Sequence, residues 1–270
     1  MKRITLSLFS CLLSFGVLSA QQGVTQCGVP TGQMPFPVLT YTELPDPMQP
    51  VPREWAMVKT PHVSWGSTDV RYAKHKVPQL KQQNTLRLHA WRGEKVNAQA
   101  VVWTGSEVEN LKCTLSDLKN NKGGLLPSDA WNIGFVRYVM TDELNKDGKG
   151  ACGHRPAHSL YDSLLVADPI DHMLQSGLLE AMTTQPVWVK CQIPQSAAPG
   201  IYKGEVCVKD GDRLLGKLKL EIHVSDRVLP VPSEWTYHLD LWQNPFAVAR
   251  YYQVPLWSQA HIDAMRPVMK

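Results

Sequence analysis

The sequence predicts a mainly β protein: an N-terminal β-sandwich of immunoglobulin-like or jelly-roll type, followed by the first βα unit of an incomplete (β/α)8 barrel. Short segments with strand chemistry follow one another between turn signals, which favours two packed sheets. Residues 169–182 are the one stretch before the boundary with a weak helical pattern. The connector Pro230-Val231-Pro232-Ser233 then precedes a different pattern, and proline stiffens the backbone there. We therefore place a domain boundary at this connector.

The first element, residues 1–20, has the pattern of a cleaved export signal. A basic start precedes an apolar run from Ile4 to Val17, and Leu18-Ser19-Ala20 offers small residues for cleavage. The run is too short to span a bilayer, so we expect no membrane span. A lipid anchor on Cys11 is a less favoured alternative. We expect an exported bacterial protein that is periplasmic, at the cell surface or secreted.

The charge of the chain is modest. Its net charge is +4 at pH 7, and loss of the signal with Lys2 and Arg3 lowers it to +2. No cluster of basic residues is visible along the remaining sequence. Nucleic acid is therefore not expected as a partner.

The sandwich is expected between residues 51 and 230, after a Pro-rich lead-in at residues 21–50. Its clearest part is a hairpin between Ile201 and Asp226, where apolar residues from Leu218 to Val224 alternate with charged ones. This alternation is typical of an antiparallel strand with one buried and one exposed face. The other expected strands are residues 85–91, 94–103, 111–118, 131–140 and 187–193.

Five cysteines remain after the signal is removed: Cys27, Cys113, Cys152, Cys191 and Cys207. An odd number leaves at least one thiol free, and their spacing does not define a pairing. A chain of this size can build a core without disulfides. Cys191 and Cys207 lie in strand patterns, so we expect both to be buried free thiols.

Residues 231–270 are expected to begin an α/β catalytic domain. Apolar residues at 237, 239 and 241 alternate with His238, Asp240 and Trp242, which would point into a barrel. A helix capped by Ser258 is expected to follow. The apolar stripe of this helix consists of Ile262, Met265 and Met269. One βα unit cannot bury its own faces, so we expect the rest of a catalytic domain beyond this chain.

Three stretches carry a family resemblance. They are LHAWRGEKVNAQAVVWTGSEVENLKCTLSDL at 88–118, QPVWVKCQIPQSAAPGIYKGEVCV at 185–208 and HLDLWQNPFAVARYYQVPLWSQAHIDAMRPVMK at 238–270. In this order they resemble glycoside hydrolase family 123. The resemblance implies a β-sandwich followed by a (β/α)8 barrel, in an enzyme that removes terminal β-linked N-acetylgalactosamine from glycans.

The resemblance also implies a substrate-assisted, retaining mechanism, in which the acetamido oxygen of the substrate attacks the anomeric carbon. In the family an adjacent Asp–Glu pair orients that group and supplies the general acid/base. No position of this chain matches the pair, so we expect the 270-residue chain to be inactive. The expected partner is the glycan, and neither a cofactor nor a metal is implied.

Four residues of the last segment are predicted to contact sugar: Asp240, Trp242, Asn244 and Arg250. They would lie at or after the C-terminal end of a barrel strand, where barrel enzymes keep their active sites. A tryptophan face can also stack on a pyranose ring. We expect most of the nine tryptophans of the chain to pack in the core instead.

Two loop motifs imitate functional sites. The adjacent acids Asp142-Glu143 are interpreted as a solvated loop, and the following residues do not complete a calcium loop. Cys152, His154 and His158 have a spacing that could hold zinc, but no second ligand cluster follows. A milder alternative is that this loop reaches a sugar together with Asp168 and Asp171.

Two other functions compete with a glycosidase. The first is a non-catalytic carbohydrate-binding β-sandwich module, which would bind glycan through residues 21–230 alone. The second is a surface adhesion module that binds a protein partner and no sugar.

Overall fold

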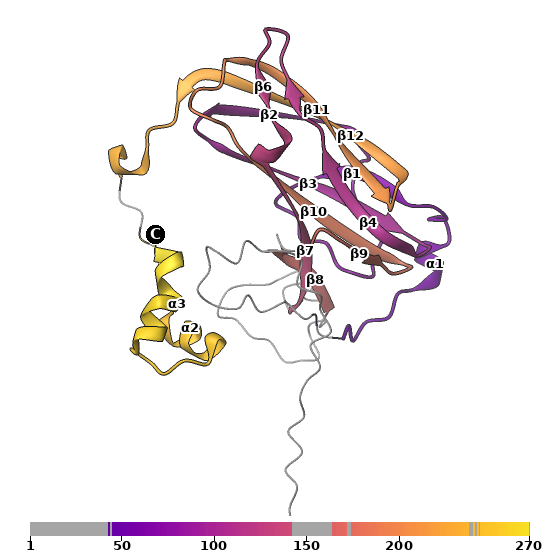
Figure 1. The fold of residues 1–270 in the computed structure, drawn as a ribbon. Coiled ribbons are helices and arrows are strands. Elements are labelled where there is room, and N and C mark those ends of the chain that lie inside the picture. The colour runs from indigo at the N-terminus through magenta and orange to yellow at the C-terminus, as the bar shows by residue number, and fades with distance from the viewer. Residues whose placement is uncertain are drawn as a thin grey trace, which may run out of the picture.

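The computed structural model describes a β-sandwich followed by two helices, and Figure 1 shows the two sheets stacked face to face. The described residues are 43, 45–141, 164–171, 174–237, 240, 242 and 244–269, apart from the side chains of Thr141, Arg250, Tyr251 and residues 267–269. The prediction of a mainly β protein is therefore confirmed.

The elements up to the middle of the chain are α1 (Pro52–Trp55), β1 (His62–Gly66), β2 (Thr85–Arg92), β3 (Lys95–Thr104), β4 (Val108–Leu115), β5 (Leu118–Lys119), β6 (Leu125–Leu126), η1 (Ser128–Ala130) and β7 (Trp131–Thr141). They are followed by β8 (Leu164–Asp171), β9 (Ser176–Leu179), β10 (Thr183–Gln192), β11 (Gly200–Asp210), β12 (Arg213–Val228), η3 (Pro232–Glu234), α2 (Pro245–Tyr252) and α3 (Gln259–Met269).

The strands form two sheets that differ in strand number and in strand direction. The five-stranded sheet has the order β1-β3-β10-β7-β8 and is antiparallel throughout. The seven-stranded sheet has the order β2-β12-β11-β4-β9, with the short strand β5 paired to β11 and β6 paired to β5. In this second sheet β2 runs parallel to β12, and the other pairs are antiparallel.

Strand β12 shows how the sequence builds the core. Its side chains from Leu218 to Val224 at even positions have no exposed surface, and they pack between the two sheets. Trp65 of β1 enters the same core, and its indole N–H donates to the carbonyl oxygen of Lys219 at 2.9 Å. This bond satisfies a polar group that burial would otherwise leave without a partner.

The strands expected from alternation are confirmed as β2, β3, β4, β7, β10 and the hairpin β11–β12. The strand expected at 111–118 begins earlier, because Val108 already pairs with Leu179 of β9, and it ends at Leu115. A bulge between Val108 and Leu111 shifts its register with β9. The weak helix expected at 169–182 is wrong. Residues up to Asp171 extend β8 along β7, and β9 begins at Ser176, so pairing with neighbouring strands overrides a weak local preference.

The barrel strand expected after residue 235 is not seen. Tyr237, Asp240 and Trp242, the described residues of that stretch, lie in no strand. A strand needs a neighbour for its N–H and C=O groups, and no described segment pairs with these residues. The helix capped by Ser258 is confirmed as α3, and α2 precedes it.

Three cysteines lie in the described part of the chain, and all three are free thiols: Cys113, Cys191 and Cys207. Cys191 is buried as expected, whereas Cys207 is half-buried because its side chain points away from the core. Cys27 and Cys152 lie outside the described residues. Within the described residues, no helix combines the length and apolar character that a membrane crossing requires.

The absence of a basic cluster, inferred from the linear sequence, does not hold for the folded chain. Strands β4, β5, β11 and β12 place lysines side by side on the outer face of the seven-stranded sheet; Lys112 lies opposite Lys209, and Lys119 opposite Lys203. Every second residue of a strand points to the same face, so scattered lysines from different strands gather there.

Candidate functional site

The helices α2 and α3 carry the region in which sugar contacts are predicted. Asn244 begins α2, because its side-chain Oδ1 accepts the backbone N–H of Ala247 at 3.1 Å. Ser258 begins α3 in the same way, with its Oγ accepting the N–H of His261 at 3.2 Å. Both residues occupy the N-cap position, where a short polar side chain satisfies a free helix N–H.

The connection between the two helices is a tight turn. Gln253 has φ 54°, which is the left-handed conformation that commonly ends a helix. The N–H of Val254 then donates back to the carbonyl oxygen of Ala249 at 3.0 Å. This bond satisfies one of the last carbonyl groups of α2 and turns the chain toward α3.

His261 joins the two helices. Its ring is completely buried, and its Nδ1 accepts the backbone N–H of Trp257 at 2.9 Å. Its Nε2 lies 2.8 Å from the carbonyl oxygen of Pro245 in α2. A carbonyl can only accept, so Nε2 carries the proton and the ring is in the Nε2–H form. Both ring nitrogens are therefore occupied within the hairpin.

Trp257 is held in an exposed position by this arrangement. It also has a left-handed backbone, with φ 61°, and 61% of its surface is exposed. Its ring lies 6.3 Å from that of Phe246 in an edge-to-face contact, and 5.4 Å from the His261 ring. A non-glycine residue in this conformation is uncommon, and such residues often occur at binding sites.

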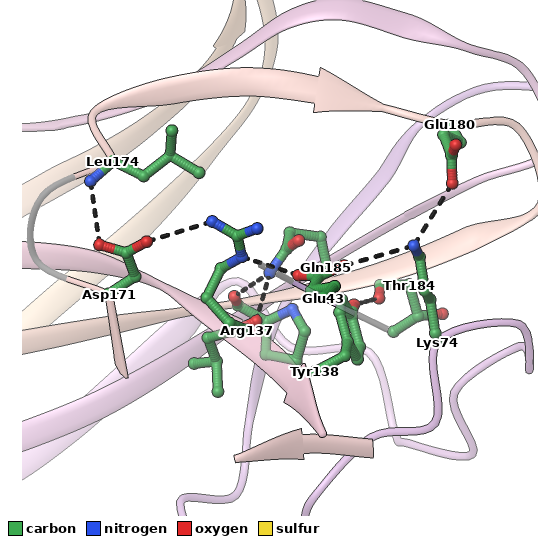
Figure 2. A network of polar contacts seen from close by, with 11 residues as sticks. Glu43, Lys74, Arg137, Tyr138, Asp171, Leu174, Glu180, Thr184 and Gln185 are labelled. Carbon is green, nitrogen blue, oxygen red and sulfur yellow. Dashed lines mark hydrogen bonds and ion pairs between the residues drawn. The ribbon is translucent and has the colours of Figure 1, made fainter. Parts of the chain in front are cut away.

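A second polar cluster lies on β7 and β8, and Figure 2 shows its centre. Arg137 of β7 donates from Nε to Glu43 Oε1 at 2.7 Å and from Nη1 to Asp171 Oδ2 at 3.1 Å. The three side chains are largely buried, with exposures of 14–18%. Paired charges in such surroundings need their partners, because a buried charge without one is costly.

Lys74 extends this cluster toward β10. Its Nζ lies 3.4 Å from Glu43 Oε2 and 3.4 Å from Glu180 Oε2, and 5.6 Å from the centre of the Tyr138 ring. The Tyr138 hydroxyl donates to the carbonyl oxygen of Thr184, and burial raises the pKa of Tyr138 well above its usual value. Glu43 belongs to the lead-in, so the cluster fastens the lead-in to the five-stranded sheet.

A small pocket beside the cluster is lined by Asp46, Val51, His75 and Leu165, among others. His75 Nδ1 donates to the carbonyl oxygen of Met182 at 3.1 Å, and its Nε2 lies 3.7 Å from Asp46 Oδ2. These groups connect the lead-in to the loop before β10. Their contacts stabilise the attachment of the lead-in. They do not form a catalytic pair of an acid and a nucleophile.

Comparisons with known proteins match two successive parts of the chain. A sequence model of the glycoside hydrolase 123 N-terminal domain matches residues 65–210, and one of the glycoside hydrolase 123 catalytic domain matches residues 242–270. The chain belongs to glycoside hydrolase family 123. The family resemblance of the three sequence stretches is thereby confirmed.

A solved family 123 glycoside hydrolase from Clostridium perfringens, studied for glycolipid glycan hydrolysis, is similar to this chain. The two are 27% identical with a TM-score of 0.66, over 78% of this chain and 35% of the clostridial one. This chain thus spans about a third of that enzyme's length. A PapD-like domain of human CEP192 is 14% identical over 72% of this chain and 100% of its own length. Its TM-score of 0.31 is too low to indicate a shared fold. No curated protein matches the chain significantly.

The four predicted sugar contacts of this family 123 chain all lie in the segment matched to the catalytic domain or just before it. Asp240 is exposed, and 97% of the Trp242 surface is exposed. Asn244 is exposed but uses its Oδ1 to cap α2, and Arg250 lies within α2 with its side chain outside the described part. Among the described side chains, Asp240, Trp242 and Asn244 make no contact with one another.

Several other predicted residues can be placed. Asp171 is bound by Arg137, and Asp168 lies 3.6 Å from Arg71, so both alternative sugar contacts have arginine partners. The loop motifs with Asp142-Glu143 and Cys152 to His158 lie outside the described residues. The described residues contain no group of three or more potential ligands that could hold a metal ion.

The expectation of core tryptophans holds for part of the set. Trp55, Trp65 and Trp103 are buried, whereas Trp91 and Trp257 are exposed in addition to Trp242. Trp257 is the aromatic residue that the sequence analysis missed as a candidate contact. The sequence indicates only that Trp257 directly precedes the N-cap Ser258 and so lies outside α3; its exposure has no local signal.

Proposed function

We propose that this chain is the N-terminal portion of an exported β-N-acetylgalactosaminidase. The sandwich supports a catalytic domain, and residues from 231 onward form the beginning of that domain. The complete enzyme removes terminal β-linked N-acetylgalactosamine from glycans by substrate-assisted, retaining hydrolysis. Its catalytic Asp–Glu pair lies outside these 270 residues, so the chain alone is inactive.

The observation that carries this proposal is the order of the two family matches. The N-terminal domain model and the catalytic domain model match the chain one after the other, at 65–210 and 242–270. The proline-rich connector at 230–233 falls between them, as expected for a boundary between two domains. The clostridial relative, which was studied for glycolipid glycan hydrolysis, supports a glycan substrate.

We also propose that the exposed residues of the last segment contact the sugar. Trp242 offers a ring face for a pyranose, and Asp240 offers a carboxylate for hydroxyl groups. The Oδ1 of Asn244 accepts a helix N–H, so its Nδ2 amide would donate to the substrate. Arg250 completes the proposed set, and Trp257 joins it because His261 holds its backbone in place.

The experiment that tests this function joins the chain to the part of a family 123 catalytic domain that follows the stretch matched at 242–270, and it measures hydrolysis of chromogenic sugars. We expect turnover of the β-N-acetylgalactosaminide with net retention at the anomeric carbon. NMR of the first product formed measures this configuration. A matched β-galactoside with a 2-hydroxyl should not be hydrolysed, because it lacks the acetamido oxygen. Equal hydrolysis of both sugars would contradict substrate assistance.

Residues 21–230 alone test the competing carbohydrate-binding function. That alternative predicts glycan binding without any hydrolysis. A preference for the β-N-acetylglucosaminide would instead retain the enzyme class and overturn the proposed sugar.

A further inference from the structure

The outer face of the seven-stranded sheet carries a concentration of positive charge. Eight basic side chains project from its strands, and we name this set the basic face. It consists of Arg87, Lys112, Lys119, Lys203, Lys209, Lys217, Lys219 and Arg227. The basic face thus holds eight of the 28 lysines and arginines of the chain.

Alternation within the strands directs these side chains outward. Lys219 lies between the fully buried Leu218 and Leu220 on β12, Lys217 precedes Leu218, and Lys203 follows the buried Tyr202 on β11. Lys112 follows the buried Leu111 on β4. The inward side chains occupy the core, so the basic ones between them face solvent.

Acidic side chains neutralise only part of this charge. Glu221 pairs with Arg87 at 3.0 Å and Lys203 at 3.3 Å, and Glu205 pairs with Lys217 at 3.2 Å. Two more acids, Glu109 and Asp226, lie at the ends of β4 and β12.

Four lysines of the basic face have no carboxylate within 4 Å among the described residues: Lys112, Lys119, Lys209 and Lys219. In two places like charges lie directly opposite each other in the sheet, Lys112 with Lys209 and Lys119 with Lys203. Directly opposed like charges destabilise a sheet. Such an arrangement is favourable when an anionic partner covers it.

Apolar side chains are interspersed with the lysines. Ile201 lies opposite His223 and Leu214 opposite Lys209, and each has 49% of its surface exposed. Trp91 is 41% exposed at the edge strand β2, with Arg227 5.6 Å from its ring centre. Exposed tryptophan and aliphatic side chains among lysines favour the boundary between headgroups and acyl chains.

We propose that the basic face docks on a bilayer containing anionic lipids. Six of its eight cations are lysines, whose point charges act on a charged surface without demanding one geometry. The two arginines, which suit bidentate recognition of a single phosphate or sulfate, are engaged with Glu221 and Trp91. The basic side chains spread over five strands of one sheet face, and this spread suits an extended anionic surface better than a single acidic chain. This inference does not depend on the proposed glycosidase activity.

The test is co-sedimentation of the chain without the expected export signal, residues 21–270, with unilamellar vesicles. We expect binding to phosphatidylcholine vesicles with about 30% phosphatidylglycerol and none to phosphatidylcholine alone. Raising NaCl from about 0.1 M to about 1 M shortens the screening length from about 10 Å to about 3 Å and should release the chain. Absence of binding to the anionic vesicles would overturn the proposal.

A pair of matched variants separates the face from net charge. Lys112→Gln with Lys219→Gln removes two charges from the basic face and should lower vesicle partitioning about 25-fold, at about fivefold per lysine. Lys59→Gln with Lys95→Gln removes the same charge from exposed positions elsewhere and should change it little. Equal losses of vesicle partitioning in the two variants would show that binding depends on the net charge of the chain and not on the basic face, and would overturn the proposal.

Heparin and duplex DNA provide the last arm of the test. Tight binding of either polymer without binding to anionic vesicles would mean that the face serves an acidic polymer, and would overturn the lipid assignment. Thermal unfolding of both double variants should match that of the parent chain, since all four lysines are surface residues.

Discussion

His261 donates from Nε2 to the carbonyl oxygen of Pro245 across 2.8 Å, and this bond ties α3 to α2. The other ring nitrogen accepts the N–H of Trp257 at 2.9 Å. One buried side chain therefore fixes both the packing of the helices and the backbone of an exposed tryptophan. The proposed sugar-contact segment depends on this histidine for its shape.

Replacing His261 with alanine should loosen the helical hairpin. The change removes two hydrogen bonds and leaves the Trp257 N–H without its partner, which costs about 2 kcal/mol of local stability. Amide hydrogen exchange in α3 should then be about 30-fold faster. His223→Ala, at an exposed histidine on β12, is the control and should leave exchange in α3 unchanged. Unchanged exchange in His261→Ala would refute the proposed role of this residue.

Replacing Arg137 with methionine should release the lead-in from the sheet. Glu43 and Asp171 would lose their partner in largely buried surroundings, at a cost of about 3 kcal/mol in the free energy of unfolding. Urea unfolding measures this loss. The exposed arginine variant Arg53→Met should have little effect. If Arg137→Met were as stable as the parent chain, the ion pairs would not fasten the lead-in.

Replacing Leu220 with alanine should destabilise the sandwich strongly. Leu220 is fully buried between the sheets, so its loss leaves a cavity and costs about 2–5 kcal/mol. The midpoint of urea unfolding should fall accordingly. Leu214→Ala, at an exposed leucine on the same strand, should change the free energy of unfolding by less than about 0.5 kcal/mol. Similar losses at both positions would contradict the core assignment.

High pH should destabilise the protein through its buried thiols. Burial raises the pKa of Cys113 and of Cys191 from 9.0 to about 12. Above pH 9 the unfolded chain ionises these thiols while the folded chain keeps them protonated. The contribution is complete below pH 9 and is lost as the pH rises to about 12.

Cys191→Ala isolates one of these thiols. Between pH 9 and about 12 the free energy of unfolding of Cys191→Ala should fall less steeply with pH than that of the parent chain. The two slopes should differ by about 1.4 kcal/mol per pH unit. Below pH 9 the two slopes should agree. Identical slopes throughout would show that the Cys191 thiol ionises equally in the folded and unfolded chains.

The sequence predicted the sandwich well where one strand face is buried. The alternation from Leu218 to Val224 specifies both the strand and its inward face, since a shift by one residue would expose the whole apolar set. Strands β8 and β9 were missed because their pairing with β7 and β4 depends on distant segments. Local pattern does not carry such information.

The functional surfaces were harder to predict. The exposure of Trp257 depends on two left-handed residues and on the buried ring of His261, which together fold back the loop between the helices. The basic face depends on strand order, because its lysines come from β4, β5, β11 and β12. Neither arrangement follows from neighbouring residues along the chain.

The most direct test of the central claim compares hydrolysis of a chromogenic β-N-acetylgalactosaminide by two proteins. One is the 270-residue chain, and the other is the same chain continued by the part of a family 123 catalytic domain that follows the stretch matched at 242–270. We predict turnover by the joined protein and none by the 270-residue chain. Turnover by the 270-residue chain, or inactivity of a folded joined protein, would contradict this prediction.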